Sequence, residues 1–150
     1  MNTIKEEQHG TILDASGLIL GRMASIVAKR ILSGEYVVIV NAEKAVISGR
    51  RLSRVKEARE FLDIGHPRKG PFHPRRPDQI VHRTVRGMLP RRLAKGQEAL
   101  RHLKVFLGVP TKLKDAPVQT IKEAHVSKLK CPYVTVEEFA KEIGYKPTGE

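Results

Sequence analysis

The pattern of apolar and polar positions in the first part of the chain alternates between strand and helix. Residues 11–15 form a short, mainly apolar segment that Ser16 and Gly17 interrupt. Apolar residues then recur at helical spacing, at Leu20, Met23, Val27 and Ile31. Gly34 follows this stripe, and glycine is common at a helix end because it readily adopts the left-handed conformation. We therefore expect a strand, a turn and an amphipathic helix.

The next apolar segment, residues 36–40, is an uninterrupted run of aromatic and β-branched residues. Such a run suits a strand covered on both faces, so we expect it at the centre of a parallel sheet. A shorter strand is expected at 45–48, and apolar residues from Leu52 to Leu62 return to helical spacing. This alternation of strands and helices around a buried strand predicts an α/β fold.

The middle of the chain begins with a segment that cannot form its own core. Residues 66–77 are dense in Pro, Gly, Arg and His, which indicates an extended loop. Asp78 is expected to cap a helix that follows this loop. That helix should break near Leu89, because Pro90 lacks the backbone N–H that a continuing helix requires.

Helical spacing resumes over 93–103, and a further strand is expected at 105–107. Residues 108–117 have the composition of a loop, and the pattern between 112 and 130 predicts no defined element.

A terminal helix is predicted by local signals. Thr135 and Glu138 have the spacing of a capping box, and residues 136–143 carry one apolar stripe. No internal repeat, low-complexity tract or long linker divides the chain. We expect residues 1–150 to form a single domain with a basic extension over about 66–104.

Charge indicates the class of partner. The chain of 150 residues has 28 Lys and Arg against 16 Asp and Glu, a formal net charge of +12. Such a positive field favours a polyanion, and nucleic acid is the first candidate. An anionic membrane would attract the same charge. However, no apolar run approaches the roughly 20 residues that span a bilayer, so we expect no membrane insertion.

The basic residues concentrate between 66 and 104. They are Arg68, Lys69, Arg75, Arg76, Arg83, Arg86, Arg91, Arg92, Lys95, Arg101 and Lys104. Only Asp78 and Glu98 oppose them. Solvated surfaces usually mix both signs, so this segment is expected to bind a polyanion.

Arginine outnumbers lysine here, and its planar guanidinium can bridge phosphate oxygens or stack on a base, which suits structured RNA. The prolines of the loop stiffen it and lower the entropy lost on binding. Phe72 and the histidines His66, His73 and His82 offer rings that could stack on bases. The alternative is that these rings pack within the protein or face solvent.

Several other classes of function lose support. Cys131 is the only cysteine, so neither an internal disulfide nor a cysteine-based zinc site is expected, and we predict no metal and no cofactor. The opening residues, 1–10, lack the basic start and apolar middle of a signal peptide, which favours the cytoplasm.

An enzyme that acts on a nucleotide or a phosphorylated metabolite is the main alternative. Its phosphate loop would be residues 17–22, and Asp14 or Glu43 would be its base. However, the glycine spacing fits neither the nucleotide-binding loop nor the dinucleotide fingerprint, and the common hydrolase and metalloprotease motifs are absent. We expect no enzyme and no small-molecule substrate.

Five strings then identify a family resemblance: LILGRMAS at 18–25, NAEKAVISG at 41–49, GPFHPRRPD at 70–78, RTVRGMLPR at 83–91 and LGVP at 107–110. Together they resemble the large-subunit ribosomal protein family L-thirteen, in its archaeal and eukaryotic branch. The resemblance covers roughly residues 11–110, and several ordered motifs make it specific. Beyond Thr111 no motif is found.

The resemblance implies a three-layer α/β/α domain on a four-stranded parallel sheet, with basic extensions on large-subunit ribosomal RNA. It puts Arg75, Arg76, Arg83, Arg86, Gly87 and Arg91 in RNA-facing motifs, and Lys44 and Ser48 in a strand-end motif. With the charge pattern, the candidate RNA-binding residues are Lys44, Arg50, Arg68, Lys69, Arg75, Arg76, Arg83, Arg86, Gly87, Arg91, Arg92 and Lys95.

The expected function is therefore that of a structural constituent of the large ribosomal subunit in the cytoplasm. It would stabilise folded ribosomal RNA, support assembly and translation, and contact neighbouring large-subunit proteins. A regulatory RNA-binding module that works away from the ribosome is the second alternative, and charge alone does not distinguish the two.

Overall fold

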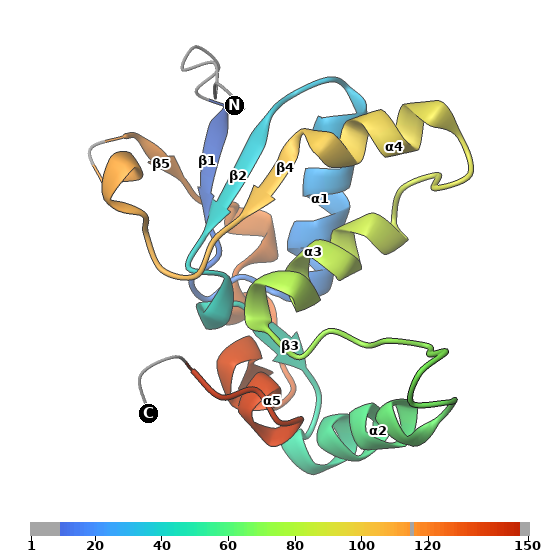
Figure 1. Cartoon of the computed structure of the whole chain (residues 1–150). Helices are drawn as coiled ribbons and strands as arrows, with labels where there is room; N and C mark the ends of the chain where they lie inside the picture. Colours follow the sequence, from blue (N-terminus) through green and yellow to red (C-terminus); the bar gives the residue numbers. More distant parts are fainter. Residues whose placement is uncertain (1–9, 115, 148–150) are drawn as a thin grey trace.

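Four short parallel strands form the main sheet, in the order β4, β2, β1, β5 (Figure 1). The computed structural model describes residues 10–114 and 116–147. Residues 1–9, most of the segment in which no signal peptide was predicted, lie outside this range. The strands are β1 (Thr11–Asp14), β2 (Val37–Val40), β4 (Leu103–Val105) and β5 (Val118–Gln119). β2 lies between β4 and β1, which confirms the central parallel strand predicted at 36–40.

Both faces of the sheet are buried near its centre. Leu13 and Ile39 are aligned partners on one face and belong to the main hydrophobic core. Ile12 and Val40 point to the opposite face, because side chains alternate along a strand, and both are buried as well. The all-parallel sheet confirms the predicted α/β class and is consistent with the three-layer α/β/α arrangement.

Three helices supply most of the remaining core: α1 (Leu20–Leu32), α3 (Pro77–Gly87) and α4 (Ala94–Arg101). α1 packs against both α3 and α4 beside the sheet (Figure 1). Met23 and Val27 of α1 and Val81 and Val85 of α3 are fully buried, so the apolar stripe predicted for α1 faces the core. α3 ends before Pro90, as its lack of a backbone donor predicts.

A smaller lobe lies beneath the sheet in Figure 1. Its strands β3 (Val46–Ser48) and β6 (Tyr133–Thr135) pair antiparallel, and its helices are α2 (Arg51–Asp63) and α5 (Val136–Glu142). Thr135 Oγ1 accepts a hydrogen bond from the Glu138 amide at 3.2 Å, which confirms the predicted N-cap. Glu142 of α5 forms ion pairs with Arg51 and Arg59 of α2.

Short 3-10 helices complete the chain: η1 (Ala42–Lys44), η2 (Thr111–Leu113), η3 (Lys122–Ala124) and η4 (Val126–Lys128). No element was predicted between 112 and 130. The described residues of this segment contain the end of η2, the strand β5, and both η3 and η4. The two residues of β5 are both exposed, so the strand has no apolar periodicity in the sequence. Only its pairing with β1 defines it as a strand.

Two further predictions were wrong in detail. The strand expected at 105–107 is β4, which begins two residues earlier and ends at Val105. Asp78 does not cap α3: the N-cap residue is Arg76, without a side-chain hydrogen bond to the helix. Asp78 lies one position after the favoured N1 proline, in the first turn, where its carboxylate pairs with Arg76 instead.

Candidate nucleic-acid interface

The loop between α2 and α3, residues 64–76, runs along the gap between the sheet and the lower lobe (Figure 1). It begins with a tight hairpin. The His66 amide donates to the Gly70 carbonyl oxygen at 3.0 Å, and the Gly70 amide donates to that of His66 at 2.9 Å. Gly70 has a φ of +86°, a conformation that glycine adopts without strain. Arg68 and Lys69 lie in this hairpin with exposed side chains.

Two of the candidate arginines also hold the loop and α3 together. Arg83 Nη1 donates a hydrogen bond to the carbonyl oxygen of Phe72 at 2.7 Å. Arg76 donates from Nε and Nη2 to the carboxylate of Asp78 at 3.2 and 2.9 Å. Asp78 is 8% exposed, so Arg76 compensates a nearly buried negative charge. Part of the predicted RNA-binding charge therefore serves the fold.

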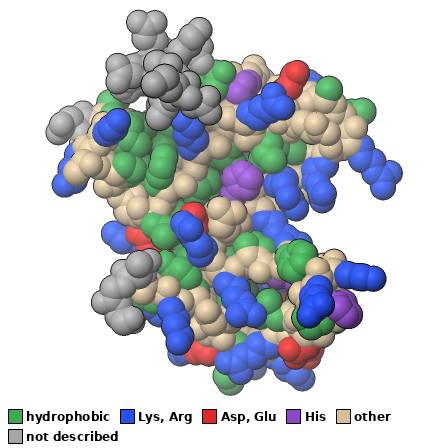
Figure 2. Space-filling model, in the orientation of Figure 1, with side chains coloured by type: hydrophobic (Ala, Val, Ile, Leu, Met, Phe, Trp, Pro, Cys, Tyr) green, Lys and Arg blue, Asp and Glu red, His purple; other side chains and the backbone are tan. Residues whose placement is uncertain are grey.

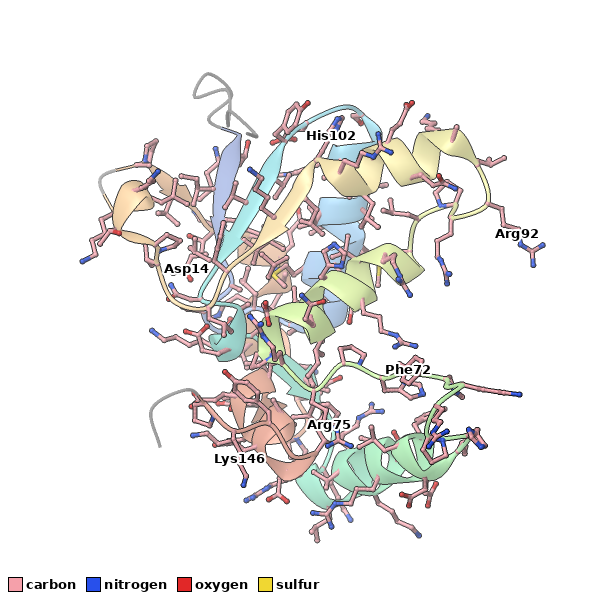
Figure 3. All side chains as sticks on the ribbon, viewed as in Figure 1. Asp14, Phe72, Arg75, Arg92, His102 and Lys146 are labelled. Atoms are coloured by element: carbon pink, nitrogen blue, oxygen red, sulfur yellow. The ribbon has the colours of Figure 1, made fainter. Side chains whose placement is uncertain are left out.

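The end of α3, its connection to α4 and the start of α4 carry a second group of cations: Arg86, Arg91, Arg92 and Lys95. Within residues 10–114 and 116–147, none of these side chains has an acidic partner. Figure 2 shows Lys and Arg side chains on both sides of a hollow between the upper and lower parts of the molecule. In Figure 3, Arg92 extends from the α3–α4 connection away from the body.

The remaining candidates lie at different places. Lys44 ends η1, and Arg50 is the N-cap residue of α2, so neither belongs to the group on the loop, α3 and α4. Arg75 is exposed and lies beside Gly144 at the end of α5. Gly87 is the exposed last residue of α3, and a side chain built there would meet no protein atom within 4 Å.

The four rings proposed for stacking are in different environments. The His73 ring lies 5.9 Å from that of Phe61 and lines a groove between α2, α3 and α5.

His82 is half-buried on α3. Burial, with the nearby Arg86, lowers the pKa of its imidazole more than Asp78 raises it, so the ring stays neutral near pH 7. His66 is exposed in the hairpin, and Phe72 is 71% exposed. The linear pattern did not distinguish these cases.

The predicted alternative of a phosphate loop fails on geometry. The strand order puts residues 17–22 where doubly wound folds bind nucleotides. Here the amides that would hold a phosphate are already used: Gly17 donates to Lys44 at 3.1 Å and Ile19 to Ala124 at 2.7 Å. His125 packs beside Gly17, so the chain itself fills this end of the sheet.

The two proposed catalytic carboxylates stabilise loops. Asp14 Oδ1 accepts hydrogen bonds from the amide and hydroxyl of Ser16 and from Asn41 Nδ2, at 2.7 to 2.9 Å. Burial alone raises the pKa of Asp14, but these hydrogen bonds outweigh it and lower the pKa below 3.8. Glu43 Oε2 accepts from the Gly108 amide at 3.0 Å. A carboxylate whose pKa is lowered, as that of Asp14 is, is a weak general base, and Glu43 is engaged with loop backbone.

The comparison with known proteins identifies the family. The family model described as Ribosomal protein L13 matches residues 8–112. This chain belongs to the ribosomal protein L13 family. It is 51% identical over 138 residues to the large ribosomal subunit protein uL13 of Methanosarcina barkeri, covering 91% of this chain and 99% of the relative. The uL13 protein of Methanopyrus kandleri is 42% identical over 147 residues, 96% of this chain and 92% of the relative.

Membership in the L13 family confirms the resemblance carried by the motifs, and it confirms that the chain is not an enzyme, because the family is ribosomal and structural. An alignment over 91% of the chain must extend past residue 112, so the segment without recognisable motifs also has counterparts in L13 proteins. In the part that the structure describes, no helix could cross a membrane, and no group of three or more metal-ligating side chains gathers.

Proposed function

We propose that this L13 protein is a structural constituent of the large ribosomal subunit that binds and stabilises folded ribosomal RNA. Its RNA-binding surface is the basic loop–helix face, defined as Arg68, Lys69, Arg83, Arg86, Gly87, Arg91, Arg92 and Lys95. The observation that carries the proposal is that its cations on the loop hairpin, the α3–α4 connection and α4 are exposed, and that those on α3, Arg83 and Arg86, are half-buried. None of these seven cations has an acidic partner among the described residues.

Electrostatics supports an anionic partner for this face. Like charges that stay solvated and unpaired repel one another, and phosphate groups relieve that repulsion while releasing condensed counterions. The hollow between the sheet and the lower lobe has cations on both sides (Figure 2). Such a surface suits a place where segments of folded RNA pack closely, because phosphates from more than one segment need neutralisation there.

The other candidates extend the proposal. Lys44, Arg50 and Arg75 lie outside the basic loop–helix face and would form separate RNA contacts, and Arg76 would contribute less because Asp78 pairs with it. The exposed apolar surface, which includes Tyr133 at 53%, offers contact area for neighbouring large-subunit proteins. We propose that residues 1–150 act as one domain, in the cytoplasm, within the subunit.

Sedimentation tests the assignment directly. A gently prepared lysate is separated on a density gradient, and the protein is located by antibody before and after ribonuclease treatment and in high salt. We expect comigration with large subunits that is lost when RNA is digested. A low-mass position that ribonuclease does not change would contradict the proposal. Release from intact subunits by high salt would identify the phosphate contacts as the main source of affinity.

A further inference from the structure

Phe72 is an exposed aromatic residue that the fold does not use. Its side chain is 71% accessible, although full burial of a phenylalanine stabilises a protein by about 1.5–3 kcal/mol. The neighbouring residue behaves differently, because the His73 ring turns to the groove and lies 5.9 Å from Phe61. Figure 3 shows Phe72 on the loop beside the gap between α3 and the lower lobe.

One neighbour holds the backbone of Phe72 and another lies against its ring. Arg83 Nη1 holds the Phe72 carbonyl oxygen at 2.7 Å, which ties the loop backbone to α3. The ring lies against Gly70, where an added Cβ would come within 3.2 Å of Phe72 Cδ2. Backbone thus covers one side of the ring and leaves most of it open. A ring held in this way loses little conformational entropy when a ligand covers it.

We propose that Phe72 is a stacking platform for an unpaired nucleobase of large-subunit ribosomal RNA, an inference that rests on the proposed function. Aromatic rings beside cationic side chains bind single-stranded RNA by stacking, while the cations hold the adjoining phosphates. Arg68 and Lys69 lie four and three residues before Phe72, in the hairpin that precedes it, and Arg83 contacts its backbone. RNA fits better than a protein partner, because each unpaired nucleotide brings a base for the ring together with a phosphate for the neighbouring cations.

The salt dependence of binding separates stacking from phosphate contact. The full chain is titrated with purified large-subunit ribosomal RNA at several salt concentrations, as wild type, Phe72→Leu and Phe72→Tyr. We expect Phe72→Leu to bind about 5- to 150-fold more weakly with an unchanged salt slope, and Phe72→Tyr to restore the affinity. Leu52→Ala, at an apolar position on α2 that is 84% exposed, serves as the control and should bind as wild type does.

A spectroscopic probe reports stacking itself. The chain has no tryptophan, so Phe72→Trp introduces a single reporter, and Leu52→Trp is its control. A stacked base should quench the fluorescence at position 72 when RNA is added and leave that at position 52 unchanged. Wild-type binding with a normal salt slope, but with no effect of Phe72→Leu and no quenching, would overturn the platform and leave the proposed function standing. A wild type without affinity for this RNA would overturn both.

Discussion

Arg83 on α3 and Phe72 in the preceding loop are joined by a hydrogen bond of 2.7 Å from Nη1 to the carbonyl oxygen. The arginine lies in a motif that the family resemblance places against RNA, yet one of its donors holds the protein's own backbone. A guanidinium has five N–H donors, so the same side chain can fix the loop and still face a phosphate. Its substitution should therefore affect loop order and RNA binding together.

Arg83→Lys tests the first of these roles, because lysine keeps the charge and loses the planar set of donors. We expect faster amide hydrogen exchange in residues 71–76 and an RNA affinity that falls by about 1 kcal/mol, with the salt slope retained. Arg86→Lys is the matched control on the same helix, since its side chain holds no loop backbone. Equal exchange rates in the two variants would contradict the anchoring role of Arg83.

Arg91→Gln and Arg92→Gln test the charge contacts. Each lost phosphate contact should reduce the slope of log affinity against log salt by about 0.7–0.9, as measured by filter binding to large-subunit ribosomal RNA. Arg59→Gln removes an arginine that is already paired with Glu142 and should change the slope little. If all three substitutions reduced the slope equally, the distinction between paired and unpaired cations would be wrong.

Gly87 and Gly96 make a matched pair in adjoining helices. At Gly96 an added Cβ would lie 2.2 Å from the Pro90 carbonyl oxygen, so Gly96→Ala should destabilise the fold by about 1–3 kcal/mol in urea unfolding. At Gly87 nothing lies within 4 Å, and Ala should stabilise the helix by up to about 1 kcal/mol. If RNA lies close to the backbone of Gly87, Gly87→Ala should weaken RNA binding even though it stabilises the protein. Unchanged binding would remove Gly87 from the interface.

The lowered pKa of Asp14 predicts that the free energy of unfolding falls at acid pH. In the folded protein the pKa of Asp14 is lowered below 3.8. The ionised carboxylate therefore contributes its full stabilisation above pH 3.8. This stabilisation is lost as the pH falls through the folded-state pKa. Asp14→Asn keeps an acceptor oxygen without the charge. We expect wild type to be the more stable at pH 6 by urea unfolding, with a difference that shrinks below pH 3.8. A difference independent of pH would contradict this linkage.

Much of the fold was predictable from local pattern. The α1 stripe of Met23 and Val27, the buried strand at 36–40 and the Thr135 cap each appear in the sequence because burial or capping acts over a few consecutive residues. The charge excess and the ordered motifs likewise identified the class of partner and the family before any geometry was known.

Local pattern was less informative where α2 and β5 form. Leu52 has the helical spacing of a core residue and is 84% exposed, because α2 is held to α5 partly by ion pairs to Glu142 rather than by a broad apolar stripe. β5 has two exposed residues, and only pairing with β1 defines it.

The sequence by itself determined the α/β class, the basic segment and the family, since these depend on composition and on short ordered strings. Only the tertiary structure decided which basic residues are available. Glu142, 83 positions further along the chain, pairs with Arg59, whereas Arg92 has no acidic partner among the described residues. The reason is physical: the charge that a side chain presents to a ligand depends on neighbours brought close by folding, and linear spacing does not report them.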